Sequence, residues 1–157
     1  MSVQSVREYL AKFGVENRIM EFNQSSATVE LAAAVVGVIP ARIAKTLSFK
    51  TPSGAMLIVA AGDAKIDNRK FKDKFGYKAK MLSADEVTEL IGHPVGGVCP
   101  FALREGVEVF LDESLKRFET VFPAAGSAAS AIELTCEELF ECSGAKEWID
   151  VGKTEIL

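Results

Sequence analysis

The sequence predicts an α+β fold in which a curved, mixed β-sheet is flanked by helices, in a single domain over residues 1–157. Segments with helical periodicity alternate along the chain with short β-rich segments, and this alternation is typical of mixed architectures. The connections at residues 51–54 and 123–130 are short, so they should join antiparallel neighbours. The length of 157 residues is about that of one domain, and 48% hydrophobic residues is typical of a globular protein.

The first half of the chain contains elements that apolar spacing and capping residues define. In order, the predicted elements are a helix over 3–13, a strand over 18–22, a helix over 28–36, a helical turn that begins at Pro40, and a hairpin of strands 46–50 and 55–61. Ser26 or Thr28 can cap the second helix at its start, and Gly37 can end it. Residues 56–60 are apolar at every position, which predicts a strand in the centre of the sheet.

The second half of the chain continues the alternation of helices and strands. The predicted elements are a helix over 68–75, a helix over 84–91, a strand over 107–111, a helical turn over 112–118, strands 120–122 and 131–134, a helix that ends near Gly144, and a closing segment at 148–151. Ser83 with Glu86, and Thr135 with Glu138, have the spacing of capping boxes at two of these helices.

Composition excludes several classes of protein. The longest apolar stretch, residues 31–39, is about half as long as the ~18 residues that a membrane span requires. Residues 1–13 lack the unbroken apolar region of a secretory signal, so we expect a cytoplasmic protein with no membrane partner. Three cysteines without a Cys-x-x-Cys pair, and one histidine, predict neither a zinc site nor a disulfide framework. No metal and no cofactor is expected.

Charge is distributed unevenly along the chain. The net charge of −4 argues against a protein that coats nucleic acid through bulk positive charge. Residues 65–80 are an exception, because they hold seven basic residues against two aspartates, a net charge of +5. The basic residues of the helix predicted there are Arg69, Lys70, Lys72 and Lys74. This helix presents either a solvated face or a surface that attracts a polyanion.

A glycine-rich loop at residues 92–100 is the most unusual stretch of the sequence. Its glycines and prolines define a backbone that side chains cannot crowd, as a loop needs if its amide N–H groups approach a ligand. A tight turn into a strand is the alternative. His93 is an acid–base group or a turn residue. Cys99 either forms a Cys–His nucleophile pair with His93 or fills the core as a small apolar residue.

Two further features can contribute to a site. Lys45 stands at the entrance to an apolar strand, where its ammonium group either meets an anion or a carbonyl inside the fold or reaches solvent along the strand edge. Ser127 and Ser130 lie in a connection of small residues, which forms either the floor of a pocket or a mobile hairpin loop.

Four segments, in this order along the chain, carry a resemblance to a known family. They are TVELAA at residues 28–33, AKTL at 44–47, GHPVGGVCPF at 92–101 and GSAASAIEL at 126–134. Together they resemble the YbaK/EbsC family of trans-editing aminoacyl-tRNA deacylases, which are related to the insertion domain of bacterial prolyl-tRNA synthetase. The resemblance covers nearly the whole chain. It implies a partly barrel-like sheet with a pocket that hydrolyses the ester between a wrong amino acid and the 3′ end of a tRNA.

The resemblance also implies roles for single residues. Lys45 matches the family's essential lysine, which holds the terminal adenosine or phosphate of the tRNA and orients the ester. Gly96 and Gly97 match glycines whose backbone shapes the pocket and contacts the reacting carbonyl. Further substrate-binding residues implied by the matching segments are Thr28, His93, Ser127 and Ser130. His93 matches a histidine of the alanine-editing branches, so a small amino acid such as alanine or serine is the expected substrate.

The partner implied by the resemblance is the acceptor 3′ end of an aminoacyl-tRNA. Arg69, Lys70, Lys72 and Lys74 would then face the acceptor stem. Association with prolyl-tRNA synthetase or another synthetase is also implied, and the chain is expected to be a monomer or a weak homodimer. Two alternatives stay open. One is a catalytically silent module of the same fold that binds aminoacyl-tRNA or an adenine nucleotide, and the other is a thiol enzyme that uses Cys99.

Overall fold

The computed structural model describes residues 2–93 and 98–154. The α-helices of this part of the chain are α1 (Val3–Leu10), α2 (Val29–Val36), α3 (Asn68–Phe75), α4 (Ala84–Glu86) and α5 (Cys136–Ser143). Its shorter helical turns are η1 (Ala11–Phe13), η2 (Glu16–Arg18), η3 (Pro40–Arg42), η4 (Val87–Ile91) and η5 (Glu113–Arg117). Its strands are β1 (Ile19–Glu21), β2 (Ile43–Thr51), β3 (Gly54–Ala61), β4 (Ala64–Ile66), β5 (Glu108–Asp112), β6 (Thr120–Pro123), β7 (Ser130–Ile132), β8 (Leu134–Thr135), β9 (Glu147–Ile149) and β10 (Gly152–Thr154).

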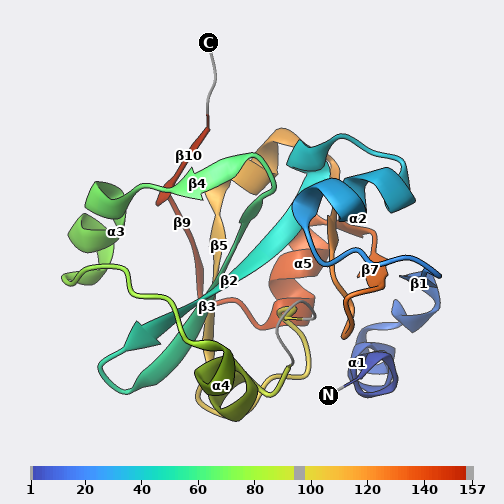
Figure 1. The fold of residues 1–157 in the computed structure, drawn as a ribbon, viewed down its shortest axis with the longest axis horizontal. Coiled ribbons are helices and arrows are strands. Elements are labelled where there is room, and N and C mark those ends of the chain that lie inside the picture. The colour runs from blue at the N-terminus through green and yellow to red at the C-terminus, as the bar shows by residue number, and fades with distance from the viewer. Residues whose placement is uncertain (1, 94–97, 155–157) are drawn as a thin grey trace.

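A mixed six-stranded sheet is the centre of the fold, as predicted. Its strand order is β8-β6-β2-β3-β5-β9, and it curls into half a barrel (Figure 1). The hairpin of β2 and β3 is antiparallel, whereas β3 pairs with β5, β5 with β9, and β2 with β6 in parallel. Residues 55–61 of β3 are all buried, which confirms that this apolar segment forms a central strand.

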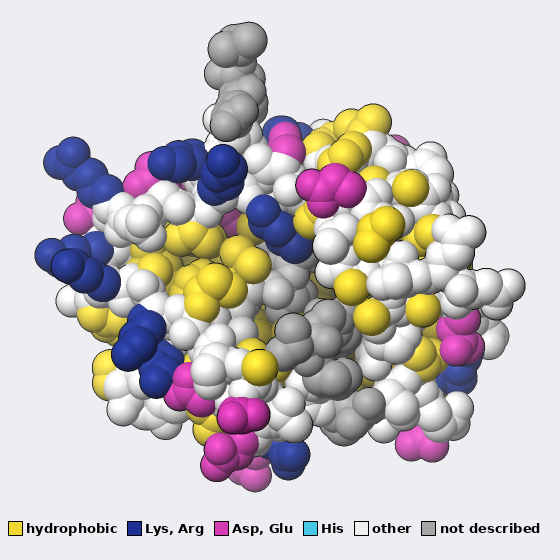
Figure 2. Space-filling view, viewed as in Figure 1, with side chains coloured by type: hydrophobic (Ala, Val, Ile, Leu, Met, Phe, Trp, Pro, Cys, Tyr) yellow, Lys and Arg dark blue, Asp and Glu magenta, His cyan; other side chains and the backbone are white. Residues whose placement is uncertain are grey.

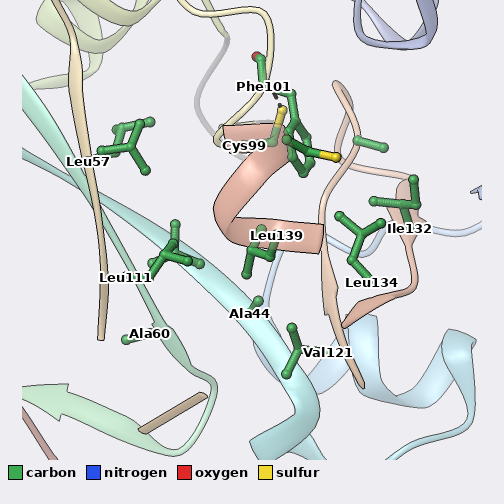
Figure 3. Close-up of a cluster of buried hydrophobic side chains, with 14 of the residues drawn as sticks. Ala44, Leu57, Ala60, Cys99, Phe101, Leu111, Val121, Ile132, Leu134 and Leu139 are labelled. Carbon is green, nitrogen blue, oxygen red and sulfur yellow. Dashed lines mark hydrogen bonds between the residues drawn. The ribbon is translucent and has the colours of Figure 1, made fainter. Parts of the chain in front are cut away.

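Helices cover both faces of the sheet because successive side chains of a strand point to opposite faces. On β2, Ala44 joins a core cluster that also contains Leu10 of α1 and Leu139 of α5. Figure 3 shows part of this cluster, with Leu139 among side chains from the sheet. The neighbouring Ile43 packs instead with α2, and Phe49 packs with α3. The other face of the sheet is therefore covered by α2 and α3, which lie well apart in Figure 1.

Local signals for helix ends are confirmed at several positions. The Thr28 hydroxyl caps α2 by accepting a hydrogen bond from the Leu31 amide at 3.1 Å. Gly37 ends this helix with φ of +86°, a left-handed conformation that glycine adopts without strain. Both predicted capping boxes are present, at Ser83 and at Thr135. These ends form as predicted because the groups involved lie within a few residues of one another.

Three features differ from the sequence-based expectation. The predicted strand 131–134 is divided at Glu133, because β7 pairs with β1 whereas β8 pairs with β6. The predicted helix 84–91 begins as α4 but ends as the π-helical turn η4. Strands β4 and β10 were not predicted. They pair with each other, although β4 lies in the first half of the sequence and β10 lies near its end. In the first and third cases long-range pairing decides the structure, which the local pattern does not specify.

Candidate functional site

A cavity of about 270 Å³ lies where β2 separates from β6. Its walls come from the start of α2, from β2, and from the segments around β6 and β7. Three of the predicted site residues, Thr28, Lys45 and Ser130, line this cavity together with Val98. Most of the remaining described lining residues are apolar, and the alanines among them are Ala27, Ala32, Ala44, Ala124 and Ala131. The cavity therefore suits a small group with one charged neighbour.

Lys45 is the charged residue among the described lining residues, and its ammonium group reaches the turn that follows β3. Its side chain is half-buried, and its ammonium group donates hydrogen bonds to the carbonyl oxygens of Ala64 and, at 3.4 Å, of Gly62. Burial lowers the pKa of Lys45, while the nearby carboxylates of Asp63 and Glu30 act in the opposite direction. The amine thus meets carbonyls inside the fold, one of the two environments that the sequence left open.

The turn after β3 holds the partners of Lys45 in place. Asp63 accepts two hydrogen bonds from the Arg117 guanidinium, at 3.0 and 2.5 Å. Hydrogen bonding to Arg117 lowers the pKa of Asp63. Gly62 packs closely: a Cβ there would collide with the Pro40 carbonyl oxygen and lie 2.7 Å from the Val29 side chain. Sequence reasoning missed this turn. The Gly62–Asp63 pair directly after an apolar strand was the available signal.

Two of the predicted substrate-binding hydroxyls shape the connection between β6 and β7. The Ser130 hydroxyl accepts hydrogen bonds from the amides of Ala125 and Ser127, both at 3.2 Å, and donates to the Ser127 carbonyl at 3.1 Å. The Ser127 hydroxyl accepts from the Ala129 amide at 3.1 Å. Ser130 lies in the cavity wall, whereas Ser127 is not among its described lining residues. Like the capping hydroxyl of Thr28, both already have partners in the backbone.

His93 is fully buried and is not among the described residues that line the cavity. Its Nε2 donates to the Phe101 carbonyl oxygen at 2.8 Å, because a carbonyl can only accept, and the Cys99 Sγ lies 3.7 Å from the same nitrogen. Within the described chain, Nδ1 has no hydrogen-bond partner. Burial lowers the pKa of His93, which favours the neutral ring. His93 thus links residues at the two ends of the glycine-rich loop.

The central part of that loop lies outside the described residues. It includes the two predicted catalytic glycines, Gly96 and Gly97. The next residue in the chain, Val98, is part of the cavity wall.

Cys99 is fully buried, and burial raises the pKa of its thiol to about 12. A thiol with this pKa is not a thiolate near neutral pH. The interpretation of Cys99 as a catalytic nucleophile is therefore not supported. In the described part of the chain, no group of three or more His, Cys, Asp or Glu side chains is placed to hold a metal ion.

The predicted tRNA-binding residues lie on α3. Figure 2 shows one face of the molecule, and basic side chains gather at its left, over α3 and the segment that follows. Lys70 forms an ion pair with Asp150 at 3.0 Å, and Lys74 forms one with Glu147 at 2.7 Å. Arg69 and Lys72 are exposed. The structure thus separates these four residues into two that are paired with carboxylates and two that project into solvent.

No helix within residues 2–93 and 98–154 has the length and apolar character that crossing a membrane requires.

Comparison with known proteins adds to this geometry. The family model of the aminoacyl-tRNA editing domain matches residues 23–142. The uncharacterized protein YwhH of Bacillus subtilis is 58% identical over 154 residues, which is 98% of each chain. The proline–tRNA ligase of Bacillus licheniformis is 30% identical over 93 residues, which is 59% of this chain and 16% of the ligase.

A solved structure shows the same fold. It is described as that of a proposed trans-editing enzyme for prolyl-tRNA synthetase, and it superimposes with a TM-score of 0.87 at 28% identity over 96% of both chains. The match of the editing-domain model extends from the segment before α2 to α5, so it includes every described wall of the cavity. This chain belongs to the aminoacyl-tRNA editing domain family.

Proposed function

We propose that this protein is an aminoacyl-tRNA deacylase that acts in trans and hydrolyses the ester of a mischarged tRNA. The observation that carries the proposal is that Lys45, a half-buried lysine, is among the residues that line a small cavity, in a chain of the editing-domain family. An aminoacyl ester is intrinsically labile, so positioning it and polarising its carbonyl can supply much of the rate acceleration.

The walls of the cavity support a small amino acid, such as alanine or serine, as the group removed. Alanines form much of the lining, and Phe122 and Val29 limit the remaining space. A larger aminoacyl side chain would require displacement of backbone or of packed side chains, which is costly in a close-packed interior.

The proposed reaction uses water as the nucleophile. Water adds to the ester carbonyl, the bond to the ribose oxygen breaks, and that oxygen takes a proton, so that free amino acid and tRNA are released. In this proposal Lys45 holds the terminal adenosine or phosphate of the tRNA, and the amides of Gly96 and Gly97 polarise the carbonyl. A lysine ammonium suits a phosphate because it acts as a point charge.

The basic side chains of α3 are proposed to attract the acceptor stem. Arg69 and Lys72 are the exposed candidates on α3, and Lys70 and Lys74 can contribute because exposed ion pairs are weak. A local basic surface gives electrostatic attraction without a basic protein overall. Association with a synthetase is part of the proposal, because the proline–tRNA ligases contain a related segment.

A panel of mischarged tRNAs tests this function directly. The wild-type protein should release amino acid from at least one of them, and Lys45→Ala should lower kcat/KM by about a hundredfold, the scale of losing one electrostatic contact in a site. Lys146→Ala is the matched control, since Lys146 is exposed and pairs with Glu108 away from the cavity. No release by the wild-type protein from any tRNA of the panel contradicts the proposal. Saturable binding of charged tRNA with an unchanged ester half-life would identify a silent binding module instead.

A further inference from the structure

The cavity lies beside a gap in the hydrogen bonding along one edge of β2. The pairing of β2 with β6 ends at Ala44, opposite Pro123. Further along the same edge, the Ser48 carbonyl accepts a hydrogen bond from the Leu82 amide at 3.2 Å. Because peptide groups alternate between the two sides of a strand, the N–H and C=O of Thr46 point to this edge, between these two positions. No described residue pairs with either group there.

The side chain of Thr46 adds a third unpaired group. Its Oγ1 is buried and has no hydrogen-bond partner among the described residues. Thr46 lines the cavity directly beside Lys45. A buried hydroxyl without a partner is destabilising, and such groups are rare in native proteins. One donor, one acceptor and one hydroxyl therefore gather on a single residue at the cavity wall.

The arrangement of these groups defines the ligand that would satisfy them. In an antiparallel pair, two residues exchange two bonds, with each N–H donating to the other's C=O. A ligand that pairs with Thr46 in this way must carry a nitrogen donor and a carbonyl oxygen. Their spacing and direction must match those of the N–H and C=O of one residue in an extended strand. An amino acid esterified through its carboxyl group has this form. Its ammonium group also has a further proton for the Thr46 hydroxyl oxygen.

We propose that Thr46 binds the aminoacyl group of the substrate as one added residue at the edge of the sheet; this rests on the proposed deacylase function. The Thr46 N–H donates to the ester carbonyl, and the α-ammonium group donates to the Thr46 carbonyl and hydroxyl oxygens. Because side chains of a strand stand out of the sheet, the substrate side chain is directed away from the strand edge and toward the cavity walls. Recognition thus requires an α-amino ester and limits its side chain by volume.

Paired substrates and paired variants test this assignment. The substrates are the mischarged tRNA that the wild-type protein hydrolyses fastest and the same tRNA carrying that acyl group without its α-amino group, for example propionyl in place of alanyl. Removal of the amino group should lower the wild-type kcat/KM by about tenfold to a hundredfold, the scale of hydrogen bonds to a charged group. Thr46→Val should lose about tenfold on the aminoacyl substrate and nothing further on the deamino substrate.

Two controls separate recognition from folding. Thr46→Ser keeps the hydroxyl and should lose less kcat/KM than Thr46→Val does, whereas Thr51→Val removes a hydroxyl from the far end of β2 and should leave kcat/KM unchanged. The thermal midpoint of Thr46→Val should equal or exceed that of the wild type, because an unpaired buried hydroxyl is removed. A lowered midpoint, equal losses on both substrates, or full activity of Thr46→Val would each overturn the assignment. In all three cases a wild-type protein that still deacylates tRNA leaves the proposed function intact.

Discussion

The single histidine of the sequence, His93, lies in the core beside the glycine-rich loop. A histidine in a sequence suggests an acid–base group at the surface of a site. The structure instead places its ring against the Phe101 carbonyl and Cys99, with its pKa lowered by burial. We therefore expect its ionisation to be visible in the stability of the protein.

Protonation of His93 should make stability depend on pH in a defined window. The unfolded chain binds a proton as pH falls through about 6.5, whereas the buried ring resists it, so the free energy of unfolding decreases by at most about 1.4 kcal/mol per pH unit. Above that pH the stabilisation is fully present. Chemical denaturation at several pH values between 7.5 and 5 measures the free energy of unfolding, with a precision of about 1 kcal/mol.

His93→Gln provides the control for this pH effect. The dependence between about pH 6.5 and 5 should disappear in this variant, because glutamine does not titrate. Carboxylates such as Glu86, whose hydrogen bond with Lys50 holds its pKa at about 2, lose their contribution only at lower pH. An unchanged pH profile in His93→Gln would contradict the assignment.

Counting the charges of helix α3 overstates its free positive charge, because the count leaves out ion pairs with carboxylates from distant parts of the chain. Asn68–Phe75 forms as predicted, with Asp67 as its cap, yet half of its predicted tRNA-binding residues are paired with carboxylates near β9 and β10. Those carboxylates lie more than seventy residues away in the sequence. The positive charge available to a ligand is therefore carried mainly by Arg69 and Lys72 within the described helix.

The double variant Arg69→Glu/Lys72→Glu should weaken the binding of tRNA more than Lys70→Gln/Lys74→Gln does. Each lost phosphate contact should also reduce the slope of log K against log[salt] by about 0.7 to 0.9. Binding measured across a range of NaCl concentrations checks both values. If affinity and slope are the same for the double variant and the wild type, α3 presents only a solvated face.

At the scale of the whole molecule, Asp112 ties the end of the chain to the sheet. This carboxylate is almost fully buried and accepts hydrogen bonds from the amides of Val151 and Gly152, both at 2.9 Å, and of Ser114 at 3.0 Å. Gly152 fits closely, since a Cβ there would lie 2.5 Å from the Asp112 Oδ2. In this way β10 reaches β4, although both strands are short.

Asp112→Ala should lower the free energy of unfolding by about 3 kcal/mol or more, because two buried amides and one partly buried amide lose a charged acceptor. Urea denaturation measures the change, and Asp150→Ala serves as the control. Asp150 is exposed and pairs with Lys70, so its loss should cost about 1 kcal/mol or less. A stability of Asp112→Ala equal to that of the control would show that these hydrogen bonds contribute little.

The sequence alone determined most of the helices, their caps, the central strand and the family resemblance. The helix caps and the central strand rest on residues close together in the chain, as Thr28 and Gly37 show at the two ends of α2, and the resemblance rests on four short segments. Only the tertiary structure decided what surrounds the side chains: Lys45 meets the carbonyls of Gly62 and Ala64, and His93 faces the core. It also decided that strand pairing changes at Glu133 and that no described residue pairs with Thr46 at the β6 edge of β2. Burial, electrostatic pairing and sheet register depend on groups far apart in sequence, which local periodicity does not encode.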